Sequence, residues 1–187
     1  MNKGFTHEAN NGVKTEVEWF TPRYILDALG NDFDLDPCSP GAGLSHVNAR
    51  RHITKEQDGL VTPWSPDEFA FVNPPYGAAT GPFLEKLASH NNGIALVFNR
   101  TDTKWFQAHA AQPSAVCFIA SRVRFHRGDR TITPPGGPGT GSMLLGFGNE
   151  AARRIRLAGL GAVCVPTPQG DCAYCGGSLT NKENKNG

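Results

Sequence analysis

Three short apolar runs, each continuous rather than alternating with polar residues, constrain the fold of this chain most. They cover residues 69–72, 94–98 and 115–119. A strand without a polar face must be buried on both sides, which is typical of a parallel sheet covered by helices. Helical patterns at 83–88 and 105–110 lie between these runs. The sequence therefore predicts an α/β fold with a mostly parallel sheet and helices on both faces.

Weaker patterns extend this sheet toward both ends of the chain. They predict strands at 33–36, 51–54, 142–147 and 161–165, and helices at 22–29 and 151–157. The first helix is expected to have Thr21 as its N-cap and Pro22 as its first residue. A Pro/Gly-rich stretch at 126–141 predicts a loop. The stretch between Asp36 and Asn73 is too short for two full strand–helix crossovers, so the fold is expected to be abridged there.

Length and composition favour one domain with two short appendages. The chain has 187 residues, and a hydrophobic fraction of 39% is sufficient for a core. We expect a domain at 19–165, a flexible N-terminal arm at 1–18 and a flexible, cysteine-containing tail at 166–187. No apolar run approaches the ~20 residues of a membrane-spanning helix, and the first residues lack a signal-peptide pattern. We therefore expect a cytoplasmic protein without a membrane partner, and the sequence leaves its oligomeric state open.

The segment Asn73-Pro74-Pro75-Tyr76 follows the apolar run at 69–72 directly. This places it at the carboxyl end of an expected strand, where open α/β sheets bind their ligands. The two prolines fix φ and restrict the residues before them, so the turn is stiff before a ligand arrives. The Asn73 side-chain oxygen and the Pro74 carbonyl can accept hydrogen bonds from a planar amine, while Tyr76 offers a flat face to a base. Two such acceptors would orient the amine's lone pair toward an electrophile. A structural proline turn with a packed tyrosine is the alternative.

Five further motifs accompany this turn in a fixed order between residues 19 and 147. They are Trp19-Phe20-Thr21-Pro22, Phe33-Asp34-Leu35-Asp36-Pro37-Cys38-Ser39, Asp58-Gly59-Leu60 with Trp64, Arg100-Thr101-Asp102-Thr103-Lys104-Trp105-Phe106, and Arg122-Val123-Arg124-Phe125. Together with Asn73-Pro74-Pro75-Tyr76-Gly77, they resemble the phage-type DNA N6-adenine methyltransferases, the Dam-type family. The resemblance implies an abridged Rossmann-like class I methyltransferase fold, S-adenosylmethionine as the methyl donor and adenine in DNA as the acceptor. It also implies the host cytoplasm as the location if the protein is phage-encoded.

The resemblance implies roles for individual residues. It assigns the chemistry to Asn73, Pro74, Pro75 and Tyr76, and donor binding to Thr21, Pro22, Asp36, Pro37 and Asp58. The Asp36 carboxylate would face the donor's methionine ammonium group, a charge-assisted contact. Asp58 would accept hydrogen bonds from the donor's ribose or adenine. Simpler roles stay open, because Thr21-Pro22 can be a helix cap and both aspartates can be ordinary turn residues.

Contact with DNA must come from a local basic patch, because the formal net charge is only +1. The candidates are Arg122, Arg124, Arg127 and Arg130. Their contacts with phosphates would offset the few kcal/mol needed to extrude a base from the duplex. A solvated basic loop is the alternative. Asp102 and Trp105 are expected to line the substrate pocket, although Asp102 can simply cap the helix that carries Trp105.

No complete metal site is expected. Cys172 and Cys175 have the spacing of half a zinc knuckle, but no second pair is present. Free thiols in the tail are the favoured interpretation. Zinc held together with Cys164 and a histidine, or shared between two chains, is the alternative.

The predicted function is methylation of the N6 amine of adenine in DNA, by direct in-line transfer from S-adenosylmethionine to a flipped base. Two other enzymes remain possible, an N4-cytosine and a protein glutamine methyltransferase, because the same turn can hold any planar amine. A non-catalytic DNA-binding relative is a third possibility, because Pro40 interrupts the glycine pattern after Asp36-Pro37.

Overall fold

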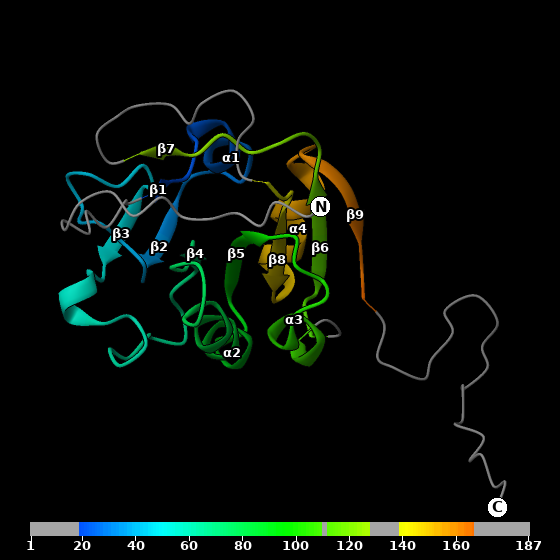
Figure 1. Ribbon diagram of the computed structural model, residues 1–187. Helices are drawn as coiled ribbons and strands as arrows, with labels where there is room; N and C mark the ends of the chain where they lie inside the picture. The colour runs from blue at the N-terminus through cyan, green and yellow to red at the C-terminus, as the bar shows by residue number, and fades with distance from the viewer. Residues whose placement is uncertain (1–18, 110–111, 128–138, 167–187) are drawn as a thin grey trace, which may run out of the picture.

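The computed structural model describes residues 19–109, 112–127 and 139–166. Within them, one mixed sheet of seven strands has the order β3-β2-β4-β5-β8-β6-β9 (Figure 1). Its strands are β2 (Phe33–Asp36), β3 (Ala49–His52), β4 (Ala70–Val72), β5 (Gly93–Phe98), β6 (Ala115–Ile119), β8 (Ser142–Phe147) and β9 (Gly161–Cys164). A separate two-stranded ribbon pairs β1 (Trp19–Phe20) with β7 (His126–Arg127).

Only one half of the sheet is parallel. β3, β2, β4 and β5 are parallel neighbours, whereas β8 runs antiparallel between β5 and β6, and β9 runs antiparallel along β6. The expectation of a mostly parallel sheet is therefore wrong for the second half. The reason is that every residue of β8 is buried. A strand buried on both faces shows the same continuous apolar pattern whichever way it runs.

Helices cover both faces of the sheet, as predicted. α1 (Arg23–Ala28) and α4 (Asn149–Leu157) pack on the face that carries Phe71 and Ile94. α2 (Thr80–His90) and α3 (Lys104–His109) pack on the opposite face, which carries Val72 and Val97. Figure 1 shows α2 and α3 on the opposite side of the sheet from α1. None of the described helices is long and apolar enough to cross a membrane.

The first helix begins one residue later than the sequence predicts. Pro22 is its N-cap, with an extended backbone (φ −61°, ψ 139°), and Thr21 lies outside the helix. No side chain caps the helix. The Thr21 carbonyl instead accepts a hydrogen bond from Nδ1 of His46 at 3.0 Å, so a contact from a distant loop decides where Thr21 lies.

The predicted abridgement is confirmed between β2 and β4. This stretch contains β3 and a single 3₁₀ turn, η1 (Lys55–Gln57), but no α-helix. The chain leaves β2 for β3 on one side and returns to β4 on the other side. The strand order therefore reverses between β2 and β4, and the crevice outside their carboxyl ends is where open α/β sheets bind ligands. Pro37 and Asn73 follow these two strand ends.

Gly93 allows β4 and β5 to pair at their amino ends. It lies opposite Ala70, and a Cβ atom at Gly93 would stand 2.4 Å from the Ala70 carbonyl oxygen. Because backbone must move to relieve that contact, we expect Gly93→Ala to lower the free energy of unfolding by about 2–3 kcal/mol. Denaturant titration measures this loss. Gly43→Ala, where nothing lies within 4 Å of the added carbon, is the control and should change stability by less than about 0.5 kcal/mol.

Candidate active site

Asn73 lies directly beyond the carboxyl end of β4, and its carboxamide has two hydrogen-bond partners. Its Nδ2 donates to the Trp19 carbonyl of β1 at 3.3 Å, and its Oδ1 accepts from the Tyr76 hydroxyl at 3.3 Å. The side chain is half-buried. Both contacts specify the same orientation of the amide, with the nitrogen toward β1 and the oxygen toward Tyr76.

Tyr76 is half-buried among aromatic rings. Its ring stacks on Phe98 with centroids 3.9 Å apart and planes inclined by 13°, and Phe125 meets its edge at 6.1 Å. Phe98 therefore covers one face of the ring, and a base can stack only on the other face. Burial raises the pKa of the Tyr76 phenol, so the hydroxyl stays protonated and can donate to Asn73.

The turn that carries these residues is fixed at its far end by Thr80. The Thr80 hydroxyl donates to the Pro75 carbonyl at 3.2 Å, and the Thr80 amide donates to the Gly77 carbonyl. Gly77 has a φ of +109°, which favours glycine. Pro74 is buried and Pro75 exposed. The turn is therefore held from both sides, by β4 before it and by α2 after it.

The predicted DNA-binding arginines begin close to this turn. Arg122 and Arg124 are exposed, and the backbone of Arg127 belongs to β7, which pairs with β1. Because the Trp19 carbonyl of β1 also accepts from Asn73, the ribbon connects this basic segment with the turn. β7 also corrects the expectation that residues from 126 onward form a loop, although only for its two residues. Arg130 lies outside the described residues.

Asp36 ends β2 and is buried, with its side chain 4% exposed. Its Oδ1 accepts from the Cys38 amide at 3.2 Å, and its Oδ2 accepts from the Ser45 hydroxyl at 2.9 Å. Nδ1 of His52 lies 3.6 Å from Oδ2 and also 2.9 Å from the Ser39 hydroxyl. The charged contact with Asp36 raises the pKa of His52. The carboxylate is thus held in one orientation, and its contact with a donor ammonium group stays a prediction.

The loop containing Asp58 lies against the end of β2. A Cβ atom at Gly59 would stand 2.0 Å from the Pro37 carbonyl oxygen, so only glycine permits this approach. Asp58 itself is exposed, with a φ of +56°, and its Oδ1 accepts from the Leu60 amide at 2.9 Å. The structure therefore brings together Pro37 and Asp58, two of the predicted donor-binding residues, at the carboxyl end of β2.

Lys86 of α2 holds this loop in place, a role that the sequence analysis missed. Its Nζ donates to the carbonyls of Gly59, Leu60 and Thr62 at 3.0, 2.8 and 2.7 Å. The ammonium group also lies 4.8 Å from the centre of the Trp64 ring, a cation–π contact. No local pattern signals this role, because the acceptors are backbone atoms more than twenty positions away in sequence.

Asp102 and Trp105 lie on the chain that follows β5. Asp102 is exposed in the turn before α3, and Trp105 is half-buried against the core face that carries α2. A Cβ atom at Gly81 would stand 3.3 Å from Cβ of Trp105, which places the start of α3 against α2. Trp105 is thus in part a packing residue, and the pocket role of both residues stays a prediction.

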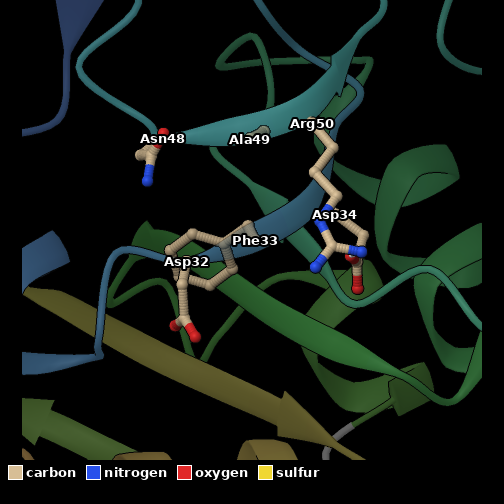
Figure 2. Close-up of a pocket in the computed structure, with 6 residues that line it drawn as sticks. All are labelled: Asp32, Phe33, Asp34, Asn48, Ala49 and Arg50. Atoms are coloured by element: carbon tan, nitrogen blue, oxygen red, sulfur yellow. Dashed lines mark ion pairs between the residues drawn. The ribbon is translucent and has the colours of Figure 1, made fainter.

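Two surface cavities lie near β2 and β3. One of about 350 Å³ is formed by residues at the amino ends of the two strands, where Arg50 and Asp34 form an ion pair at 3.2 Å (Figure 2). This is the end of the sheet opposite Asn73. The other, of about 530 Å³, has a mostly polar lining that includes Arg23, Ser45 and His52. Through Ser45 and His52 it adjoins the Asp36 network.

Residues 19–109, 112–127 and 139–166 contain no group of three or more His, Cys, Asp or Glu side chains placed to hold a metal ion. Cys172 and Cys175 lie outside these ranges, as do the predicted arm and most of the predicted tail.

The strand order of this sheet reverses beside an Asn-Pro-Pro-Tyr turn, and helices cover both faces of the sheet. This arrangement is that of a Rossmann-like methyltransferase. The family model of DNA N-6-adenine-methyltransferase (Dam) matches residues 9–155. The chain belongs to this family, so it is a DNA adenine methyltransferase and its substrate is DNA. This confirms the resemblance seen in the motifs. No curated protein and no solved structure matches the chain.

The ion pair between His52 and Asp36 predicts a pH dependence of stability. Because the pKa of His52 is raised in the folded protein, its stabilising contribution is complete below the unfolded pKa of about 6.5 and is lost as the pH rises through the folded value. We expect the stability difference between wild type and His52→Asn to be constant below about pH 6.5 and to shrink as the pH rises from there through the raised pKa of His52. Denaturant titrations across this range measure it. His109→Asn is the control, and a His52→Asn difference that stays constant as the pH rises would contradict the prediction.

Proposed function

We propose that this enzyme transfers a methyl group from S-adenosylmethionine directly to the N6 amine of an adenine flipped out of DNA. The observation that carries the proposal is the fixed orientation of the Asn73 carboxamide at the switch point of the sheet. The bond from its nitrogen to the Trp19 carbonyl turns its oxygen toward Tyr76, and this oxygen is the acceptor that would meet an incoming amine.

Asn73 acts as an acceptor for one N–H of the adenine amine. An amide oxygen accepts two hydrogen bonds, and the Tyr76 hydroxyl uses one of them. The Pro74 carbonyl, on the same stiff turn, accepts the second N–H. These two acceptors favour a pyramidal nitrogen whose lone pair points away from them, and the gain is orientation rather than base strength.

Tyr76 holds the adenine ring by stacking on the face that Phe98 leaves uncovered. Stacking of a base on an aromatic side chain contributes about 1–3 kcal/mol. The neutral phenol also donates to Asn73 and so keeps the amide oxygen aimed at the amine. Tyr76 therefore has two separable roles, one in its ring and one in its hydroxyl.

The residues around the ends of β2 and β4 suit the proposed donor. S-Adenosylmethionine, when bound, would supply an electrophilic methyl group, whose bond to sulfur breaks as the bond to the amine nitrogen forms and which leaves behind a neutral thioether. Asp58 presents an exposed carboxylate beside Pro37, suited to ribose hydroxyls. Thr21 contacts His46, which lines the polar cavity, and Pro22 precedes Arg23, which also lines it. Asp36 contributes negative charge beneath this region, with its orientation held by Ser45 and Cys38.

As the amine gains a methyl group it becomes positively charged and must lose a proton. The Asn73 oxygen and the Pro74 carbonyl stabilise that charge because both are dipoles with their negative ends toward the nitrogen. The proton then leaves to solvent, directly or after brief contact with the Asn73 oxygen. No strong base is needed, because the positively charged, methylated nitrogen of an aromatic amine is a strong acid compared with water.

Asn73→Ala removes the carboxamide and should lower the methylation rate at least about 100-fold, because one of the two acceptors is lost. Tritium transfer from labelled S-adenosylmethionine to unmethylated genomic DNA measures the rate, and mass spectrometry of the nucleosides identifies the product. Asn92→Ala, in the turn before β5, is the matched control and should retain wild-type activity. N4-methylcytosine as the sole product would overturn the proposed substrate.

The two roles of Tyr76 predict different losses of methylation rate for two substitutions. Tyr76→Phe keeps the ring and loses only the hydrogen bond to Asn73, so we expect the rate to fall less than about fivefold. Tyr76→Ala loses the stacking surface and should cost about 10- to 100-fold. Single-turnover rates at saturating DNA distinguish the two. Equal losses for both variants would show that the ring does not hold the base.

A further inference from the structure

Residues 122–126 alternate between exposed and buried side chains. Arg122 and Arg124 are exposed, whereas Val123 and Phe125 are 0% and 2% exposed. This period of two is that of an extended strand with one face toward the core. One short segment therefore presents basic groups to the outside and apolar groups to the inside.

The buried side of this segment contacts the catalytic turn. The Phe125 ring meets the edge of Tyr76 with centroids 6.1 Å apart and an interplanar angle of 79°. It meets Phe98 in the same way, at 6.1 Å and 89°. Because Phe98 stacks on Tyr76 at 3.9 Å, the three rings form one aromatic cluster, and Phe125 fixes the lateral position of the other two.

The end of the segment contacts the turn by a second route. His126 pairs with Phe20, and Arg127 pairs with Trp19, whose carbonyl accepts from the Asn73 amide. The His46 ring packs against both Phe20 and His126, at 5.4 and 5.5 Å, and so braces the two strands. The segment thus supports Tyr76 through a side chain and Asn73 through backbone pairing.

We propose that Phe125 is a positioning residue for methyl transfer, which holds the Tyr76 ring where the flipped base stacks, while its neighbour Arg124 binds the DNA backbone. The inference rests on the proposed function of Tyr76. Neighbouring residues of one extended segment then serve different steps. Arg124 acts on DNA affinity, and Phe125 acts on the rate after DNA is bound.

The test compares the steady-state kinetics of Phe125→Leu and Arg124→Gln on unmethylated genomic DNA. Phe125→Leu should lower kcat about 10-fold and leave the KM for DNA within about twofold, because the ring of Tyr76 loses its support only after binding. Arg124→Gln should raise the KM for DNA about 10-fold and weaken its salt dependence, because one phosphate contact is lost. Phe125→Leu should therefore change mainly kcat, and Arg124→Gln should change mainly the KM for DNA.

Phe69→Leu is the control for loss of an aromatic ring from the same core. Phe69 is buried and stacks on Phe33, and it belongs to the same core cluster as Phe125. It should lower Tm without changing kcat. If Phe125→Leu does not fold, Phe98→Leu is the second variant. Phe98 is half-buried and its ring stacks on Tyr76, so its loss should lower kcat in the same way.

Three outcomes would overturn the inference. They are an unchanged kcat in the folded Phe125→Leu or Phe98→Leu protein, a Phe125→Leu effect confined to the KM for DNA, and an equal loss of kcat in Phe69→Leu. Absence of N6-methyladenine in the wild-type reaction would instead contradict the proposed function, so the two failures are distinguishable.

Discussion

The close pairing of β4 with β2 on one side and β5 on the other determines the position of the turn that carries the proposed chemistry. β4 is only three residues long, and all three are buried. Its pairing with β5 depends on Gly93, because any side chain there would meet the Ala70 carbonyl. The turn that begins at Asn73 is the direct continuation of this strand. A shift of β4 would therefore displace the acceptors of the proposed reaction by the same amount.

The site is organised by orientation rather than by unusual reactivity. The Asn73 carboxamide is held from both ends, and the carboxylate of Asp36 is held by an amide, a hydroxyl and an imidazole. A planar aromatic amine is a weak nucleophile, and its reaction is accelerated mainly by correct placement. Side chains that are ordered before the substrate arrives lose little entropy when it binds. This agrees with a turn that contains two consecutive prolines.

Because the fold is abridged, the small ribbon of β1 and β7 has a large influence on the position of Asn73. No α-helix lies between β2 and β4, and the neighbours of the turn at Asn73 include β1, whose Trp19 carbonyl accepts from Asn73 and which pairs with β7. The ribbon connects the segment that carries the exposed Arg122 and Arg124 with the turn at Asn73, so one segment would serve both the proposed DNA contact and the proposed placement of the base. Lys86 supports the loop beside the end of β2, where the donor is proposed to bind, by donating to three carbonyls of the loop that follows Asp58.

Local sequence patterns were enough to identify β2, β6 and β8 to the residue, because turn residues bound each of them and their apolar positions follow a strand pattern, continuous in β6 and alternating in β2. They were also enough to find the Asn-Pro-Pro-Tyr turn and the family, because the motifs that identify both are short stretches of consecutive residues. The direction of β8, the start of α1, the pairing of β1 with β7 and the partners of Asp36 depend on groups far apart in the chain. Only the tertiary structure decided these, because hydrogen-bond partners and strand direction are chosen by the packing of distant segments, which a local pattern of apolar and polar residues does not encode.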